Sequence, residues 1–274
     1  MRWVEAGGGW VAELHDPSDR FSKPEDVAIE VFALLRQSSE THAVLEWQRF
    51  ITKTYSDERG FFDAAARDAI QGQPSTISEY APVFSTQLAV ESLTGPEHFD
   101  HPFRAARKDY YPGNLQSVIT STQQEHIVRT IARPWDYGDA MANQSLRLDH
   151  GDDRRHAYQW HAPTEDPARQ KNGCMLGANR LAIESFPLFP CIPATGGSTA
   201  VGFEFKSRTQ AWVNWPVWGV PCSLAVVASL LNSPLIHGSE PDMHSLRKMG
   251  VLAVLRSRRL PIEKNKVFLP PETF

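Results

Sequence analysis

Carboxylates and imidazoles that could bind a metal ion are concentrated in one polar segment of the chain. Residues 149–156 read Asp-His-Gly-Asp-Asp-Arg-Arg-His. Carboxylate oxygens suit Mg²⁺ and Mn²⁺, and imidazole nitrogens suit Zn²⁺, when such side chains converge. The spacing matches no established metal motif, and Arg154 and Arg155 could neutralise the aspartates instead. We therefore predict a solvated, salt-bridged loop with neither a metal nor another cofactor.

A second candidate is a turn with two glycines, Gly173 and Gly177, in front of a predicted helix. Backbone N–H groups in such a turn can bind a phosphate, and Asn179 and Arg180 beside it would suit a nucleic-acid backbone. The turn has neither the Lys-Ser/Thr pair of a P-loop nor the G-x-G-x-x-G pattern, so it does not predict ATP or dinucleotide binding. On these residues alone, a helix start that uses glycine for close packing is the favoured interpretation.

The C-terminal stretch is the strongest electrostatic candidate for contact with phosphate. Arg247 and Lys248 come first, and Arg256, Arg258 and Arg259 follow a predicted buried strand. Because side chains alternate along a strand, Arg256 and Arg258 would project to one face and Arg259 to the other. An edge strand protected by charge explains these residues about as well.

Large aromatic side chains are abundant near these groups, and the bases of single-stranded nucleic acid stack on exposed aromatic rings. They are Tyr110, Tyr111, Trp135, Tyr137, Tyr158, Trp160, Trp212, Trp215 and Trp218. Most large aromatics belong to a core, and we expect no more than two or three of these to be exposed.

Motifs of several enzyme classes are absent from the sequence. It contains neither a G-x-S-x-G elbow nor an H-E-x-x-H pair. The three cysteines, Cys174, Cys191 and Cys222, are too irregularly spaced for a disulfide framework or a zinc knuckle. We expect them to be small buried residues in a reducing compartment. These absences favour a protein that is not an enzyme, without deciding the matter.

The composition is that of an ordinary globular protein. Of 274 residues, 41% are hydrophobic and 22% are charged. No apolar run approaches the roughly 18 residues of a membrane helix, and the N-terminus lacks a signal-peptide core, so we predict a cytoplasmic protein outside the membrane. The net charge of −4 disfavours general adhesion to phosphate backbones. Residues 1–100 carry 8 basic and 17 acidic groups, whereas residues 244–274 carry 7 basic and 2 acidic groups.

The elements that must position these residues begin with a predicted β-hairpin. Residues 2–5 and 10–14 alternate around Gly7, Gly8 and Gly9. Ser22, followed by Pro24 and Glu25, is typical of a capped helix start. The inner face of that helix is predicted from helical spacing, and its members are Val27, Val31, Leu34 and Leu35.

Two further helices are predicted in the first half of the chain. One covers residues 60–70, and the other runs without a break over 115–131. Leu115, Val118, Ile119 and Ile127 form the apolar stripe of the second, which Pro134 ends.

After Ser185 the pattern changes to strands. Strands are predicted over 199–205 and 211–215, a helix over 224–231 with Ser223 as its cap, and a buried strand over 251–255. Residues 151–173 predict a surface loop. The whole pattern predicts an α+β fold in which a hairpin and mainly helical region, 1–145, packs with a mixed, mostly antiparallel β region, 146–274. The two regions form either separate units or one continuous domain.

Several motifs between Arg133 and Phe205 resemble those of one known family. They are Arg-Pro-Trp-Asp-Tyr at 133–137, Ser-Leu-Arg-Leu-Asp at 145–149, Asp-Asp-Arg-Arg-His-Ala-Tyr-Gln-Trp at 152–160, Gly-Ala-Asn-Arg-Leu-Ala-Ile-Glu at 177–184 and Phe-Pro-Leu-Phe-Pro at 186–190. Together they resemble CRISPR-associated proteins of the type I-G (formerly I-U) systems, in the large-subunit-like or helicase-extension group. Members of that family usually carry a glycine-rich segment and an apolar helix before the hairpin, which this sequence lacks.

The resemblance implies a non-catalytic subunit of an RNA-guided effector complex of the Cascade kind in antiviral defence. Its partners would be other effector subunits and guide RNA or target DNA, and protein subunits in such complexes hold the nucleic-acid backbone. The expected contacts are Arg154, Arg155, Asn179, Arg180, Arg247, Lys248, Arg256, Arg258 and Arg259. The alternatives are a purely protein-binding scaffold and a metal-dependent nuclease that uses Asp149, Asp152, Asp153 and His156.

Overall fold

The computed structural model describes residues 1–16, 18–39, 42–45, 58–72, 75–84, 111–139, 146, 148, 173–194, 197–205, 210–238, 240–262 and 265–274. The following lie outside these residues: residues 151–172 of the predicted surface loop, the Asp149–His156 cluster, Arg154, Arg155, Tyr110, Tyr158 and Trp160.

The predicted N-terminal hairpin is confirmed. Strands β1 (Arg2–Ala6) and β2 (Gly9–Glu13) pair antiparallel, with Ala6 opposite Gly9. Gly7 and Gly8 have φ values of 61° and 81°, as a two-residue hairpin turn of the primed type requires. The hairpin packs against the C-terminal half of the chain, because Trp3 meets Trp218 edge to face, with ring centroids 6.1 Å apart.

Helix α1 (Pro24–Ser38) is confirmed, but its predicted cap and inner face are partly wrong. The residue at the N-cap is Lys23, which makes no side-chain capping bond, and Ser22 Oγ donates instead to the Asp26 carboxylate at 3.3 Å. Ala28 and Leu35, seven residues apart, are the buried positions, whereas Leu34 is 58% exposed. Helix α1 is therefore covered along one narrow stripe by α7 (Gln124–Ala132) rather than over a wide face.

The predicted helix over 115–131 is two helices. Helix α6 (Tyr111–Ser121) ends before Thr122, and α7 begins at Gln124 after a capping box formed by Gln123 and His126. The break divides the apolar residues of the predicted stripe between two cores. Leu115, Val118 and Ile119 pack with α4 (Thr76–Phe84), whereas Ile127 packs with α1. The predicted helix over 60–70 is confirmed as α3 (Glu58–Ile70).

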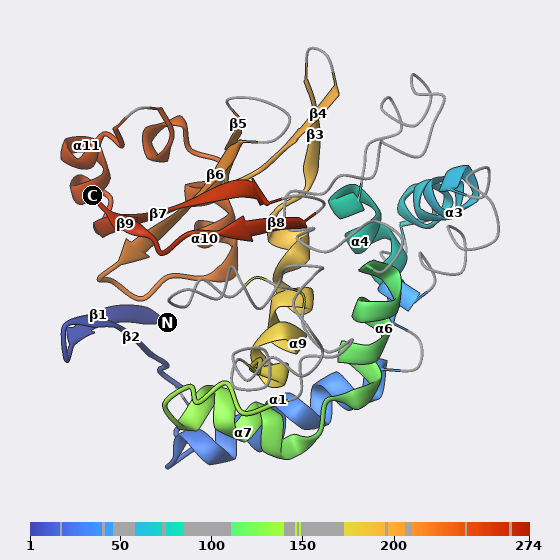
Figure 1. Ribbon diagram of the computed structural model, residues 1–274, viewed down its shortest axis with the longest axis horizontal. Helices are drawn as coiled ribbons and strands as arrows, with labels where there is room; N and C mark the ends of the chain where they lie inside the picture. The colour runs from blue at the N-terminus through green and yellow to red at the C-terminus, as the bar shows by residue number, and fades with distance from the viewer. Residues whose placement is uncertain are drawn as a thin grey trace.

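Helix α9 (Leu176–Ser185) and the short 3-10 helix η4 (Phe186–Leu188) connect the helical half to the strands. Leu176, Ile183 and Phe186 are buried in the core that α4 and α6 also build. Figure 1 shows α9 standing between the strands and helices α1, α6 and α7.

The second half of the chain is built on antiparallel strands. They are β3 (Cys191–Ala194), β4 (Gly197–Ala200), β5 (Phe203–Phe205), β6 (Ala211–Trp218), β7 (Val251–Ile262), β8 (Asn265–Phe268) and β9 (Glu272–Thr273). β3 and β4 form a hairpin, and the larger sheet has the order β5-β6-β7-β8, with β9 also paired to β7. The predicted strand over 199–205 is interrupted by a turn at Val201 and Gly202, where Gly202 has a φ of 74°.

Short helices cover parts of this sheet. Helix α10 (Leu224–Leu231) begins as predicted at Ser223, whose Oγ accepts a hydrogen bond from Val226 N at 3.4 Å. The 3-10 helix η5 (Pro234–Ile236) and helix α11 (Met243–Lys248) bury Ile236 and Leu246 against Val251 and Val254 of β7. On the other face, Phe203, Ala211 and Trp218 are packed with Phe189.

The fold is α+β, as the sequence predicts, with helices dominating the first half and antiparallel strands the second (Figure 1). Contacts cross the predicted boundary near residue 145, since Met1 O accepts hydrogen bonds from Trp218 Nε1 at 2.9 Å and Cys222 N at 3.0 Å. Among the described residues, no helix combines the length and the apolar character needed to cross a membrane.

Candidate nucleic-acid interface

Asn179, predicted to contact a nucleic-acid backbone, is buried inside the protein. Its Oδ1 accepts a hydrogen bond from Leu146 N at 2.9 Å, and its Nδ2 donates to Met175 O at 2.9 Å. Both ends of the side-chain amide therefore hold neighbouring backbone in place. The prediction of a surface contact is corrected for this residue, because its side chain is not accessible to a ligand.

Arg180 is buried as well, and its charge is neutralised internally. The guanidinium forms an ion pair with Glu184, one helical turn further on, and approaches Leu35 O at 3.5 Å. Glu184 also accepts a hydrogen bond from His42 Nε2 at 3.0 Å and one from the Tyr80 hydroxyl at 3.3 Å. This network joins α1, α4 and α9, so Arg180 has a structural role in place of the predicted phosphate contact.

The ionisation of this network follows from its surroundings. Burial alone would raise the pKa of Glu184, but the hydrogen bond from His42 and the charge of Arg180 outweigh burial and lower that pKa to about 2. Burial and the neighbouring Glu184 charge raise the pKa of Tyr80 well above its usual value. Glu184 is therefore ionised and Tyr80 neutral at physiological pH, and the network is a paired internal cluster.

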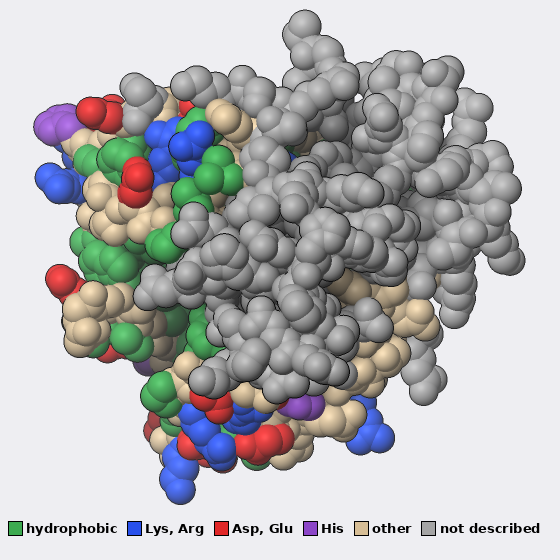
Figure 2. All heavy atoms as spheres, viewed as in Figure 1, with side chains coloured by type: hydrophobic (Ala, Val, Ile, Leu, Met, Phe, Trp, Pro, Cys, Tyr) green, Lys and Arg blue, Asp and Glu red, His purple; other side chains and the backbone are tan. Residues whose placement is uncertain are grey.

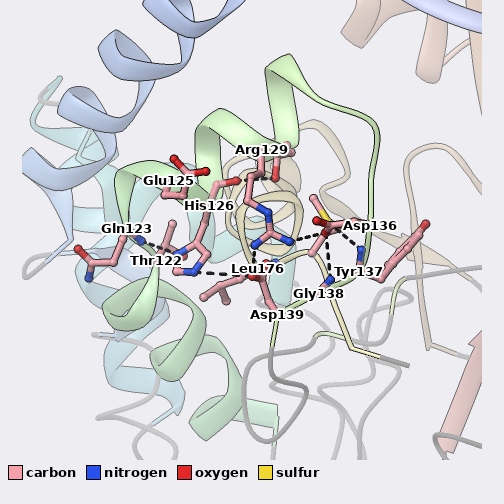
Figure 3. A network of polar contacts seen from close by, with 12 residues as sticks. Thr122, Gln123, Glu125, His126, Arg129, Asp136, Tyr137, Gly138, Asp139 and Leu176 are labelled. Carbon is pink, nitrogen blue, oxygen red and sulfur yellow. Dashed lines mark hydrogen bonds and ion pairs between the residues drawn. The ribbon is translucent and has the colours of Figure 1, made fainter. Parts of the chain in front are cut away.

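A second polar network surrounds Arg129 and holds the start of α9 (Figure 3). The guanidinium forms ion pairs with both Asp136 and Asp139. The other carboxylate oxygen of Asp139 accepts a hydrogen bond from Leu176 N at 2.8 Å. This N–H belongs to the first residue of the helix, where the helix itself provides no acceptor. His126 Nδ1 accepts from Gln123 N at 2.9 Å, while His126 Nε2 lies 3.8 Å from Asp139.

The Arg133–Tyr137 motif, which contributes to the family resemblance, builds this corner of the structure. Trp135 Nε1 donates to Thr130 O at 3.0 Å, and Tyr137 adopts a left-handed φ of 52° while its N–H points to Met175 Sδ at 3.3 Å. Hydrogen bonds from Gly138 N and Arg129 lower the pKa of Asp136. The charged groups are thus satisfied within the corner, whose role is structural. The described residues contain no group of three His, Cys, Asp or Glu side chains arranged to hold a metal ion.

The basic strand β7 separates its arginines as the sequence predicts. Arg259 lies opposite Phe268 in the sheet and is fully buried. Its predicted contact with nucleic acid is corrected, because the side chain offers no surface to a ligand. Arg256 and Arg258 project to the opposite face, where Arg258 lies directly across from Trp212 of β6.

Arg256, Arg258 and Trp212 form one compact group on that face. The guanidinium carbons lie 5.1 Å and 5.7 Å from the centroid of the Trp212 ring, within the range of cation–π attraction. Figure 2 shows Lys and Arg side chains gathered among hydrophobic ones over the part of the sheet between α11 and β5. We call Arg256, Arg258 and Trp212 the arginine–tryptophan face.

Glu204 of β5 sets the charge of the arginine–tryptophan face. Its Oε2 lies 2.9 Å from Arg256 Nη2 and also accepts a hydrogen bond from Gly238 N at 3.1 Å. Arg258 differs, because within the described part of the chain no carboxylate pairs with it and its Nε lacks a hydrogen-bond partner. Among the described residues of the face, Arg258 is therefore the cation that no carboxylate neutralises.

A layer of neutral groups supports these residues from beneath. Asn214, fully buried on β6, donates from Nδ2 to His237 Nδ1 at 3.0 Å, and His237 Nε2 lies 3.4 Å from Leu231 O. Burial lowers the pKa of His237, so the ring is neutral, with the proton on Nε2 directed at that carbonyl. His237 thus fixes the loop that presents Gly238 to Glu204.

Arg247 and Lys248 are exposed but lie apart from this face. Both belong to the last turn of α11. Arg258 lies seven residues beyond Val251 along β7, which corresponds to roughly 23 Å at the usual rise of a strand. The structure therefore brings Arg256 and Arg258 together and leaves Arg247 and Lys248 as a separate pair.

Sequence reasoning missed Glu204, Asn214 and His237. Glu204 stands between Phe203 and Phe205 in an alternating pattern, which signals that it faces away from the core. No comparable signal marks Asn214 and His237, because their pairing depends on how the loop after α10 folds over β6.

Comparison with known proteins found no similar protein. No protein-family model matches this chain, and no curated protein or solved structure gives a significant match.

Proposed function

We propose that this chain is a non-catalytic subunit of a type I CRISPR RNA-guided effector complex and that it holds single-stranded nucleic acid on the arginine–tryptophan face. The resemblance over residues 133–205 suggests the class of complex. The observation that carries the binding role is the pair of arginines, Arg256 and Arg258, placed over the ring of Trp212 on one face of the sheet.

The chemistry of this face suits a sugar–phosphate backbone with unpaired bases. Guanidinium groups donate hydrogen bonds to phosphate oxygens with little dependence on sequence. A tryptophan beside them offers an aromatic surface to a base, and base stacking on aromatics supports binding to single strands in general. Such contacts hold a strand in place, while base pairing with the guide supplies the sequence specificity.

Charge confines the contact to this face. The chain has a net charge of −4, and its first 100 residues are strongly acidic, so most of the surface repels a polyanion. Arg258 is the cation that no carboxylate neutralises among the described residues of the face. We therefore expect modest affinity that falls steeply with salt.

A substitution at Arg258 tests the proposal. Binding of a fluorescently labelled single-stranded RNA and its DNA counterpart is followed by anisotropy between about 50 and 200 mM salt. Arg258→Ala should raise Kd about fivefold, because one charged hydrogen bond to phosphate contributes about 1 kcal/mol or more. The slope of log Kd against log salt should fall by about one.

Arg36→Ala is the matched control, since Arg36 is an exposed arginine on α1 and its loss changes the net charge equally. It should leave Kd nearly unchanged. Equal effects of the two substitutions, or salt-independent binding of the wild-type chain, would contradict the proposal. Cleavage of the oligonucleotide that needs Mn²⁺ and stops with EDTA would instead support the nuclease alternative.

A further inference from the structure

Three large apolar side chains are about half exposed at one end of the sheet, where β6 ends and β7 begins. Val220 is 50% exposed, Met249 51% and Leu252 45%. Figure 2 shows hydrophobic side chains gathered on the left edge of the molecule, with basic side chains above them near α11. We call Val220, Met249 and Leu252 the apolar patch.

A β-bulge exposes one member of the apolar patch. Val217 is opposite Ala253 and Trp218 is opposite Val251, so Leu252 is an extra residue without a partner in the ladder. Its neighbours Val251 and Ala253 are buried, whereas Leu252 points to solvent. Bulges re-aim a side chain at the cost of a ladder pair, and they are frequent next to functional surfaces.

Two glycines let the apolar patch lie flat on the backbone. A Cβ added at Gly219 would lie 2.9 Å from Leu252 Cδ1, and one added at Gly250 would lie 2.8 Å from Val220 Cγ2. Gly250 also has a φ of 84°, which disfavours any side chain there. Leu252 therefore lies over Gly219, and Val220 lies over Gly250.

Two cations border the apolar patch. Arg247 and Lys248 directly precede Met249, and both are exposed. No carboxylate pairs with either of them in the part of the chain that the structure covers. The combination is a small apolar surface with unpaired positive charge on one side.

We propose that the apolar patch is a docking site for an acidic amphipathic helix of a partner protein. A helix satisfies its own backbone, which suits this surface because Gly219 N is already bonded to Gly250 O at 2.9 Å. Apolar side chains one turn apart would cover Val220, Met249 and Leu252, and flanking Asp or Glu would meet Arg247 and Lys248. This docking does not depend on nucleic-acid binding, since none of these residues belongs to the arginine–tryptophan face.

The test selects ligands without assuming a sequence. A display library of random peptides about 16 residues long, enough for four helical turns, is panned against the whole chain. Enriched peptides should carry apolar residues at helical spacing flanked by Asp or Glu. Their affinity should fall about tenfold or more with Leu252→Asp and about fivefold with the double change Arg247→Glu and Lys248→Glu.

Leu34→Asp is the matched control, because Leu34 is a leucine on α1 that is 58% exposed, against 45% for Leu252. It should leave peptide affinity unchanged, as should Arg258→Ala, and circular dichroism melting should show that each variant is folded. Lack of enrichment, or peptides that are not acidic or that bind Leu252→Asp equally well, would overturn the inference. Two other results would also overturn the inference. One is a dimer of the chain that Leu252→Asp abolishes, and the other is binding to phosphatidylserine vesicles that Leu252→Asp abolishes. The patch would then serve self-association or a lipid surface.

Discussion

Arg180 and Arg258 are both arginines near predicted apolar segments, yet their surroundings give them different roles. Arg180 is enclosed and paired with Glu184, four residues further along the same helix. Arg258 lies beside Trp212 with no carboxylate partner among the described residues. The spacing of four residues between Arg180 and Glu184 is visible in the sequence and is typical of an ion pair within one helix. Burial of the pair is not visible, because it depends on α1 and α4.

The alternation of side chains along β7 was sufficient to assign its arginines to the two faces of the sheet. Arg256 and Arg258 were expected on one side and Arg259 on the other, and the sheet register confirms this. Which side is buried could not be predicted from β7 alone. It depends on Phe268 of β8 and on the covering of the sheet by distant residues such as Phe189.

Removing the charge of Glu204 should strengthen nucleic-acid binding. Glu204→Gln keeps an acceptor for Gly238 N but leaves Arg256 without its paired anion. We expect Kd for single-stranded RNA to fall about threefold and the salt dependence to steepen, because one more cation becomes available to phosphate. Glu30→Gln, at an exposed position of α1, changes the net charge equally and should have little effect. An equal gain in both variants would contradict a local role for Glu204.

The Glu184 network should make stability depend on pH in acid. The folded-state pKa of Glu184 is about 2, against an ordinary value of 4.5. Its ion pair therefore stabilises the fold fully above pH 4.5, and that contribution is lost as pH falls toward 2. Glu184→Gln should lower the free energy of unfolding by about 2 kcal/mol near neutral pH, allowing for its partial exposure.

Urea unfolding of both proteins at a series of pH values checks this prediction. The difference between wild type and Glu184→Gln should shrink as the pH is lowered from 6 toward 3. A difference that stays constant over this interval would show that the carboxylate charge does not stabilise the fold.

At the scale of elements, local sequence signals predicted the starts of helices and the positions of turns better than they predicted breaks within a helix or strand. Gly7 and Gly8 predicted the hairpin turn, and Ser223 predicted the start of α10. The break at Thr122–Gln123 was missed because Ile127 was assigned to the same stripe as Leu115, Val118 and Ile119, although residues 120–126 contain no apolar side chain. The break at Val201–Gly202 was missed because apolar residues continue on both sides of it. Each break redirects the chain toward a different core, and this depends on tertiary packing rather than on local preference.

The close approach of α9 to α7 should be intolerant of any side chain at Gly177. A Cβ there would lie 2.2 Å from His126 O and 2.4 Å from Thr130 Oγ1. Gly177→Ala should therefore lower the free energy of unfolding by about 3 kcal/mol, because backbone must move.

Gly113→Ala is the control for that substitution, since nothing lies within 4 Å of the added Cβ in α6. It should raise the free energy of unfolding by about 0.5 kcal/mol through helix propensity. Urea unfolding measures both changes. Similar results for the two glycines would contradict the packing of α7 on α9.

At the scale of the whole molecule, α9 and the N-terminal hairpin connect the two predicted regions. α9 contributes to the helical core, and the hairpin, although first in sequence, packs on the sheet through Trp3 and Trp218. The N-terminal hairpin and the basic strand β7 therefore belong to one connected structure. In the proposed function, the arginine–tryptophan face attracts a polyanion to a chain whose net charge is −4.

Photocrosslinking tests this central claim most directly. A single-stranded RNA containing 4-thiouridine is bound to the whole chain at low salt, irradiated and mapped by mass spectrometry. The account predicts crosslinks at Trp212 and in the Arg256–Arg258 segment of β7, and their loss in Arg258→Ala. Crosslinks confined to other parts of the chain, with β6 and β7 unmodified, would contradict it.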